Sequence, residues 1–283
     1  MTTGHLINRR KQDREAGHMK TDGQDSGKTV LITGTTSGIG YELSRVFAAQ
    51  GLNLVLVSRN ERKLKAQTEA LQSEYGIAVH TVISDLSEPS APAEIFANVR
   101  SRGIHVDILV NNAGFNESGP FRETRLEQEL RMLQVHIATL THLTKLFLPG
   151  MIEKKYGQIL NFGSTGSFAP CPLDAVYCAT KAYVLSFSSA LRAELSGTGV
   201  TVSTVCPGAT KTEFAKKANM ENTLLFRKFV MEPREVAAIA YRGLMKNKKI
   251  IVPGFYNRIL VLSIPFTPGK ILEKIGTSLL KRR

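Results

Sequence analysis

The sequence predicts a single α/β domain, a doubly wound parallel sheet of about seven strands with helices on both faces. Short runs rich in Val, Ile and Leu alternate with longer helical stretches, and the connections between them are short. The runs are continuously apolar, which is typical of parallel strands buried on both faces. The pattern covers residues 29–253 with no internal repeat and no dividing linker.

The elements follow in a regular order along the chain. The predicted strands are Thr29–Thr33, Asn53–Ser58, Val79–Ser84, Ile108–Asn111, Gln158–Phe162, Val200–Val205 and Lys249–Val252. The predicted helices lie between them, near residues 39–50, 61–75, 90–102, 123–148, 175–196 and 233–246. Glycines stand where helices should stop, at Gly51, Gly76, Gly103 and Gly197.

Composition excludes several classes of protein. Of the 283 residues, 42% are apolar and 22% charged, which fits neither a disordered nor a fibrous chain. The longest apolar stretch, Ile259–Phe266, is interrupted by Ser263 and Pro265 and is far shorter than the roughly 20 residues of a membrane span. The three cysteines are too few for a disulfide framework and match no zinc pattern. We therefore expect no metal site and a reducing, cytoplasmic compartment.

The charge is basic and unevenly distributed. The chain has 37 Lys and Arg against 24 Asp and Glu, and residues 246–283 hold nine basic side chains and one acid, or +8 of the net +13. Such a segment fits nucleic acid, an anionic membrane surface or simply a soluble surface. No basic stripe with interleaved aromatic residues and no known nucleic-acid module is present, so we expect no nucleic-acid partner.

Two flanking segments differ from the regular region. Residues 1–28 are charged and glycine-rich and lack the apolar core of a signal peptide, which predicts a mobile extension. Residues 254–283 mix apolar and basic residues and are predicted to form a tail at a subunit interface or on an anionic membrane surface. Pro265 and Pro268 would break an anchoring helix, which favours the interface.

A glycine-rich loop follows the first predicted strand. It reads Thr33-Gly34-Thr35-Thr36-Ser37-Gly38-Ile39-Gly40. Glycine lets the backbone turn sharply and approach a ligand, and the helix that follows presents free N–H groups and the positive end of its dipole. At the first strand-to-helix turn of an α/β domain, this loop predicts a dinucleotide pyrophosphate site, and a plain tight turn is the alternative.

The ends of the next two strands carry polar residues. The second strand ends at Ser58 and Arg59, where a dinucleotide site faces the adenosine ribose. Arginine can pair with a 2′-phosphate, so Arg59 favours NADP(H) over NAD(H); a solvent-exposed arginine starting a helix is the alternative. Asp85, at the end of the third strand, could accept a hydrogen bond from the adenine amino group.

A phenol and an ammonium group share one helical face. Tyr177 and Lys181 are four residues apart, so they lie on the same side of a helix. A nearby cation lowers the pKa of a tyrosine, which suits a group that exchanges a proton with an alcohol or a carbonyl. Ser164 follows the fifth strand, where its hydroxyl could hold the substrate oxygen.

Taken together, these motifs resemble those of the short-chain dehydrogenase/reductase family in its single-domain, Rossmann-type form. The matching motifs, in the family's order, are Thr33–Gly40, Asn111–Gly114, Ser164, Tyr177 with Lys181, and Pro207-Gly208 followed by Thr212. Five motifs in register make the resemblance specific, whereas each alone is a weak signal.

The resemblance implies roles for individual residues. Tyr177 is expected to be the general acid in reduction and the base in oxidation, with Lys181 binding the nicotinamide ribose and lowering the pKa of Tyr177. The expected phosphate contacts are Gly34, Thr36, Ser37, Gly38, Ile39 and Gly40. The expected adenosine contacts are Arg59, Asp85, Leu86, Asn112, Ala113 and Gly114. The expected nicotinamide contacts are Pro207, Gly208, Thr210 and Thr212.

One position departs from the family pattern. Many members have Asn after Val in the long helix that follows Asn111–Gly114, and this Asn holds a water of a proton relay; here the pair is Val135-His136. An imidazole has both a donor and an acceptor nitrogen and could hold the water instead. The alternatives are a weaker relay and a His that is merely packed.

The substrate side carries fewer signals. Phe115, Phe168 and Phe214 flank the motifs and could form an apolar pocket, or they could pack the bases of their loops. Residues 211–231 lie where the family keeps its mobile substrate lid. The apolar residues expected on the underside of this lid are Phe214, Met220, Leu224, Leu225 and Phe226.

The sequence therefore predicts an NADP(H)-dependent oxidoreductase that acts on a fairly apolar carbonyl or secondary alcohol. The resemblance also implies a homodimer or homotetramer. Two alternatives stay open: a dinucleotide-binding regulator that has lost catalysis, with His136 as its only support, and an epimerase or dehydratase of the extended fold, whose loop spacing and larger substrate domain this chain lacks.

Overall fold

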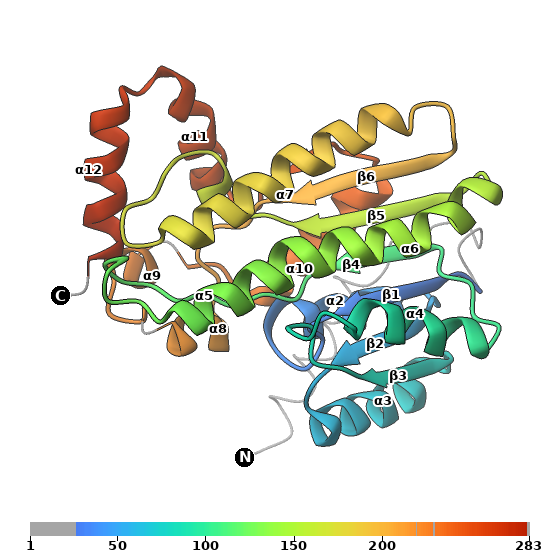
Figure 1. Ribbon diagram of the computed structural model, residues 1–283. Helices are drawn as coiled ribbons and strands as arrows, with labels where there is room; N and C mark the ends of the chain where they lie inside the picture. The colour runs from blue at the N-terminus through green and yellow to red at the C-terminus, as the bar shows by residue number, and fades with distance from the viewer. Residues whose placement is uncertain (1–26, 219, 229, 282–283) are drawn as a thin grey trace, which may run out of the picture.

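One parallel sheet forms the centre of the molecule (Figure 1). The computed structural model describes residues 27–218, 220–228 and 230–281, so nearly all of the expected N-terminal extension 1–28 lies outside the described residues. The strands are β1 (Thr29–Thr33), β2 (Asn53–Ser58), β3 (Val79–Ile83), β4 (Ile108–Asn111), β5 (Gly157–Phe162), β6 (Val200–Val205) and β7 (Ile250–Ile251). Their order is β3-β2-β1-β4-β5-β6-β7, and every pairing is parallel. The predicted fold class is confirmed.

Alternate residues of each strand face opposite layers of helices. In β1, Val30 and Ile32 belong to one apolar cluster and Leu31 to the other. The first cluster includes side chains of α2 (Gly38–Ala48), α3 (Glu61–Tyr75) and α10 (Pro233–Met245). The second includes side chains of α4 (Ala91–Ser101), α6 (Leu140–Glu153) and α7 (Ala175–Glu194). Burial on both faces explains why the strands are continuously apolar.

The strand order places the site. The chain winds outward from β1 to β3, then crosses to β4 and winds outward in the other direction to β7. At the carboxyl ends of β1 and β4 the loops on the two sides of this reversal run in opposite directions and leave a crevice between them. Open parallel sheets bind ligands in such a crevice. The glycine-rich loop after β1 and the Asn111–Gly114 segment after β4 both lie at this crevice.

The long helix predicted for residues 123–148 differs from the expectation in three ways. It consists of α5 (Leu126–Leu133), a π-helical segment at Gln134–Thr139, and α6, which continues past Pro149 to Glu153. A proline interrupts the helical hydrogen bonds, but Phe147 and Met151 on either side of it are buried against the sheet. Their packing outweighs the local cost of the proline.

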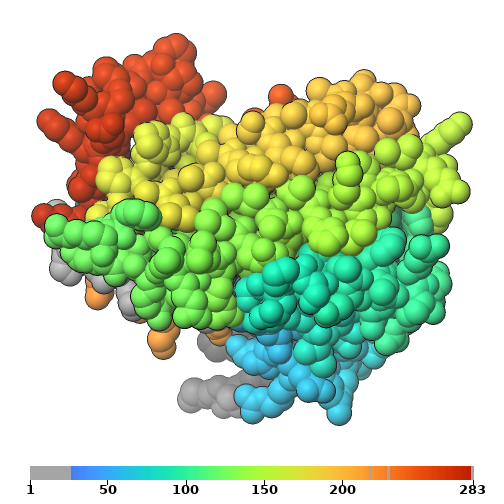
Figure 2. Space-filling model, in the orientation of Figure 1, coloured from blue at the N-terminus to red at the C-terminus, as the bar shows by residue number. Residues whose placement is uncertain are grey.

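The last part of the chain forms a lobe beyond the carboxyl edge of the sheet. Two short helices, α8 (Glu213–Lys217) and α9 (Leu224–Lys228), follow β6. Residues 254–281, here called the C-terminal lobe, form α11 (Phe255–Ser263), a 3₁₀ turn at Ile264–Phe266 and α12 (Gly269–Leu280). The lobe projects from the body of the molecule (Figures 1 and 2). As expected, the helix breaks at Pro265 and Pro268.

Among the described residues, every helix is too short or too polar to cross a bilayer. Within the same residues, His, Cys, Asp and Glu side chains do not gather in a group that could hold a metal ion.

Candidate active site

The glycine-rich loop is closely packed and needs its glycines. Gly34 has φ +71°, and a Cβ atom there would lie 2.8 Å from the Ala113 Cα. Gly38 has φ +58°, and a Cβ atom there would lie 2.9 Å from the Thr212 Cγ2. Any side chain would therefore be strained and would collide with the neighbouring loops.

Asn112 supports this loop from the next strand. Its side-chain amide donates to the Thr33 and Gly34 carbonyl oxygens, at 2.9 and 3.1 Å. The Thr33 hydroxyl accepts from the backbone N–H groups of Asn112 and Ala113. The Asn112 amide thus fixes the loop, although the residue was expected chiefly to line the adenosine site.

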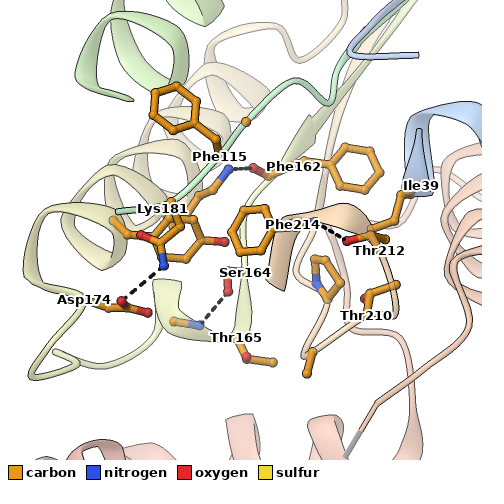
Figure 3. Close-up of a pocket in the computed structure, with 18 of the residues that line it drawn as sticks. Ile39, Phe115, Phe162, Ser164, Thr165, Asp174, Lys181, Thr210, Thr212 and Phe214 are labelled. Atoms are coloured by element: carbon orange, nitrogen blue, oxygen red, sulfur yellow. Dashed lines mark hydrogen bonds between the residues drawn. The ribbon is translucent and has the colours of Figure 1, made fainter. Parts of the chain in front are cut away.

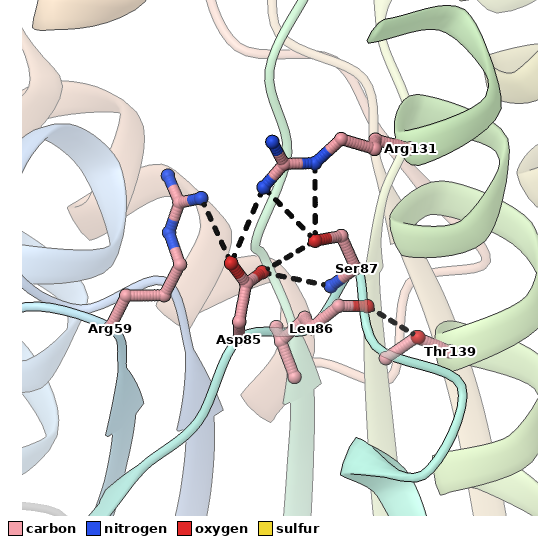
Figure 4. Close-up of polar contacts among 6 residues, drawn as sticks. All are labelled: Arg59, Asp85, Leu86, Ser87, Arg131 and Thr139. Atoms are coloured by element: carbon pink, nitrogen blue, oxygen red, sulfur yellow. Dashed lines mark hydrogen bonds and ion pairs between the residues drawn. The ribbon is translucent and has the colours of Figure 1, made fainter. Parts of the chain in front are cut away.

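A small ion-pair network lies where the adenosine is expected (Figure 4). Arg59 and Arg131 each donate to the Asp85 Oδ2 at 3.3 Å. Burial by itself raises the pKa of Asp85, but hydrogen bonds from Ser87 and the Arg59 charge outweigh it and hold this pKa below its ordinary value. Sequence reasoning found Arg59 and Asp85 but missed Arg131, which approaches from α5, far along the chain.

The predicted catalytic residues converge on one cavity (Figure 3). Ser164 stands between β5 and a short 3₁₀ turn, and its hydroxyl hydrogen bonds with the Tyr177 phenol. The Lys181 Nζ donates to the Phe162 carbonyl oxygen at 2.9 Å and lies 5.7 Å from the centre of the Tyr177 ring. The Phe214 ring packs edge-on against Tyr177, with 5.7 Å between ring centres.

Burial controls the protonation of this group. It raises the pKa of Tyr177 well above its ordinary value, although the hydrogen bond with Ser164 opposes the change. It also lowers the pKa of Lys181 to about 8. Burial, which removes each charged form from water, is the largest cause of both changes. The expected stabilisation of the Tyr177 phenolate by Lys181 stays a prediction.

His136 does not line the main cavity. Its Nε2 accepts from the Phe115 N–H at 3.2 Å, and its Nδ1 therefore carries the proton and donates to the Thr180 hydroxyl at 2.9 Å. Thr180 in turn donates to the Tyr177 carbonyl oxygen. Both ring nitrogens thus bond to protein atoms, as in the packed alternative, and the relay role stays a prediction. The ring links the Phe115 loop to the helix that bears Tyr177.

The main cavity encloses about 420 Å³. Every predicted catalytic and cofactor-binding residue except His136 contributes to its lining. Of the expected apolar residues, Phe115, Phe214, Met220, Leu225 and Phe226 line it, whereas Phe168 and Leu224 do not. The C-terminal lobe supplies a wall that sequence reasoning did not anticipate, made of Leu260, Ile264, Leu272, Ile275, Gly276, Leu279 and Leu280. This wall is continuous with the segment predicted to be the lid, because Leu280 and Met220 belong to one apolar cluster.

A second polar pair was also missed. Asp174 is 5% exposed, lines the cavity three residues before Tyr177, and accepts from the Asn116 side-chain amide at 3.1 Å. Burial raises the pKa of Asp174 to about 6, against opposing hydrogen bonds from Ser118 and Asn116. The two residues lie in separate loops with no spacing signal, so only the fold brings them together.

The crevice suits a dinucleotide. Within the described part of the chain, the Ser37 side chain does not cap α2, which leaves N–H groups of the first turn directed at the crevice. The missing side chains of Gly34 and Gly38 leave room at the same point. A pyrophosphate would supply the acceptors that this helix end lacks.

Comparison with known families agrees with this geometry. The model of the family described as short chain dehydrogenase matches residues 28–223. The chain belongs to the short-chain dehydrogenase/reductase family. The match includes the glycine-rich loop, Ser164, Tyr177 and Lys181, and it ends before the C-terminal lobe.

Individual relatives within the family resemble the chain at moderate identity. A very-long-chain 3-oxoacyl-CoA reductase of Anas platyrhynchos is 32% identical over 69% of this chain and 63% of its own length. A hydroxysteroid dehydrogenase-like protein 1 of Gallus gallus is 30% identical over 88% of this chain and 73% of its own length. The chain thus spans about two thirds of the length of these relatives.

A solved structure matches the fold closely. A short-chain dehydrogenase from Sphingobium yanoikuyae, in complex with NADPH, is 35% identical, with a TM-score of 0.76. The match covers 83% of this chain and 92% of that one.

Proposed function

We propose that the protein is an NADP(H)-dependent oxidoreductase that interconverts an apolar carbonyl compound and the corresponding secondary alcohol. The observation that carries this proposal is the placement of Ser164, Tyr177 and Lys181 in the same cavity as the glycine-rich loop. The match to an NADPH-bound short-chain dehydrogenase supports the choice of cofactor.

The residues divide the work. Bound NADP(H) supplies or accepts a hydride at its nicotinamide ring. The Ser164 hydroxyl orients the substrate oxygen beside the Tyr177 phenol. Since burial raises the pKa of Tyr177, the phenol holds its proton at neutral pH and can donate it to a carbonyl oxygen. Lys181, with a pKa of about 8, keeps its charge at neutral pH and stabilises the phenolate that forms.

Substitution of Tyr177 by Phe tests this mechanism. We expect the rate of NADPH-dependent carbonyl reduction to fall by about 100-fold or more, because general acid catalysis contributes at least this factor, while NADPH binding measured by fluorescence persists. Tyr183→Phe is the matched control, since the Tyr183 hydroxyl bonds with Thr141 and lies outside the cavity lining. Unchanged turnover in Tyr177→Phe would refute the proposal.

The preference for NADP(H) is assigned to Arg59. Its side chain is 64% exposed and bonds with Asp85 at 3.3 Å, so it can exchange this contact for a 2′-phosphate at little cost. We expect Arg59→Ala to lower the ratio of kcat/KM for NADPH to that for NADH by about 10- to 100-fold, the value of a charge-assisted hydrogen bond. Arg62→Ala, at an exposed position on α3, should leave the ratio unchanged. If Arg59→Ala leaves the ratio of kcat/KM for NADPH to that for NADH unchanged, the assignment of the preference to Arg59 is wrong.

The substrate is proposed to carry an apolar chain. The cavity extends from Tyr177 to the lid and to the C-terminal lobe, whose lining residues are Leu, Ile and Gly. Such a wall favours an aliphatic chain or a fused apolar ring system. The similarity to very-long-chain 3-oxoacyl-CoA reductases supports the aliphatic form. In a screen of ketones, kcat/KM should rise with chain length, and a preference for short polar ketones would contradict this substrate class.

A further inference from the structure

The outer face of the C-terminal lobe is apolar and exposed. Phe255, Ile259, Leu262 and Phe266 follow one another at spacings of three and four residues, and so share one side of α11 and its extension. Their exposed fractions are 71, 50, 71 and 87%. Such a stripe of large apolar side chains usually marks a binding surface.

The inner face of the same lobe is also apolar. Leu260 of α11 and Ile264 of the 3₁₀ turn line the cavity, as do Leu272 and Leu279 of α12. A helix that is apolar on opposite sides is normally buried on both. The inner side of the lobe lines the cavity, so the outer side needs a separate apolar partner, either protein or lipid, to cover it.

The charge of the lobe indicates which kind of partner covers its outer side. Between residues 254 and 281 there are four basic side chains, Arg258, Lys270, Lys274 and Lys281, and one acid, Glu273. Lys270 and Lys274 are exposed and stand on one side of α12, just after the Phe266 turn. Apolar side chains can enter the acyl-chain region of a bilayer, and basic side chains beside them can bind its anionic headgroups.

A second copy of this chain fits the lobe less well. A two-fold interface brings the same surface of both subunits together. The basic residues of one lobe would then face those of the other, and like charges across an interface are unfavourable. This reverses the preference that the two prolines gave in the sequence. In the structure the two prolines stand at a turn where Phe266 is 87% exposed.

We propose that the C-terminal lobe docks on an anionic lipid surface through Phe255, Ile259, Leu262 and Phe266, with Lys270 and Lys274 at the headgroups. The lobe lies on the bilayer without crossing it, because the described helices are too short or too polar to span one. Docking places the wall between α11 and α12 next to the bilayer, so that an apolar substrate enters the cavity from the lipid. This entry route rests on the proposed function, whereas docking does not.

Vesicle co-sedimentation tests docking without cofactor or turnover. The full chain should bind phosphatidylcholine vesicles that contain phosphatidylserine, and bind weakly to phosphatidylcholine alone. Leu262→Ser/Phe266→Ser should lower the partition coefficient by about tenfold or more, from the apolar area lost. Lys270→Glu/Lys274→Glu should lower it by at least about 25-fold, since each basic side chain contributes about fivefold.

The controls change equivalent side chains on other elements. Ile152→Ser, on α6, and Arg62→Glu/Lys65→Glu, on α3, should bind as the parent chain does. Thermal unfolding of each variant reports that it is folded. Equal binding by the lobe variants and the controls would overturn the proposal. It would also be overturned if the lobe variants changed the molecular mass in solution but not vesicle binding, since the surface would then be a subunit interface.

The entry route has a separate test. With a long-chain methyl ketone supplied in phosphatidylserine vesicles, Leu262→Ser/Phe266→Ser should lower kcat/KM. With a short water-soluble ketone it should not. Equal loss on both substrates would overturn the entry route, and absence of activity in the parent chain would contradict the proposed function while leaving the docking result intact.

Discussion

The carboxyl group of Asp174 makes folding less favourable as the pH rises, and the size of this effect follows from the structure. The group is 5% exposed, and burial raises its pKa from 3.8 to about 6. The folded protein therefore holds this proton more tightly than the unfolded chain does. Between pH 3.8 and 6 the unfolded state binds fewer protons than the folded state does. The contribution of Asp174 to the free energy of unfolding therefore falls as the pH rises through this window, and it is constant above it.

Substitution of Asp174 by Asn removes the charge and keeps the shape. The new side-chain oxygen can still accept from the Asn116 amide, which bonds with the carboxylate at 3.1 Å. A pKa difference of about two pH units corresponds to about 3 kcal/mol at neutral pH, and to about 1 kcal/mol at pH 4.5, where the unfolded chain is only partly ionised. Relative to the parent, Asp174→Asn should therefore gain about 2 kcal/mol of unfolding free energy between about pH 4.5 and 7.5.

Urea-induced unfolding of both proteins at a series of pH values checks this. Only the difference between the two curves matters, because all other titrating groups are common to both. A difference that stays constant from about pH 4.5 to 7.5 would refute the reasoning and would mean that Asp174 ionises as freely in the folded state as in the unfolded chain.

Two further predictions concern the loop and the buried histidine. Gly38→Ala should lower the free energy of unfolding by about 1–2 kcal/mol, because φ is +58° and the methyl group meets Thr212. It should also weaken NADPH binding. Calorimetry measures both effects, and an unchanged affinity for NADPH would contradict the assignment of the crevice. His136 should stay neutral from pH 6 to 8, because burial and the Lys181 charge hold its pKa well below 6.5; its ring signals in NMR should not titrate, and a titration near pH 6.5 would contradict its buried bonds to Phe115 and Thr180.

Much of the fold could be predicted because the signals are local. Parallel strands buried on both faces need continuous apolar runs, and all seven predicted strands agree with the observed ones to within one residue at each end. The last, predicted as Lys249–Val252, is only Ile250–Ile251. The glycine-rich loop and the Tyr177–Lys181 spacing are also local, so their elements could be placed without knowledge of the rest of the chain.

The remaining features depend on contacts between distant segments. Arg131 reaches Asp85 from a helix 46 residues away, and Asn116 reaches Asp174 across 58 residues. No periodicity or spacing reports such a contact. The rise of the Tyr177 pKa could not be predicted for a related reason, since the sequence shows that Lys181 is near but not that both groups are buried.

The reversal of winding between β1 and β4 also separates two kinds of specificity. The contacts expected for the adenosine and phosphates come mainly from residues 34–85, on one arm of the sheet, whereas the catalytic residues, the lid and the C-terminal lobe follow residue 157 on the other arm. Substitutions on opposite arms that share no partner act almost independently. The choice of coenzyme and the choice of substrate can therefore change one at a time, and variants that alter each can be combined with their effects multiplying.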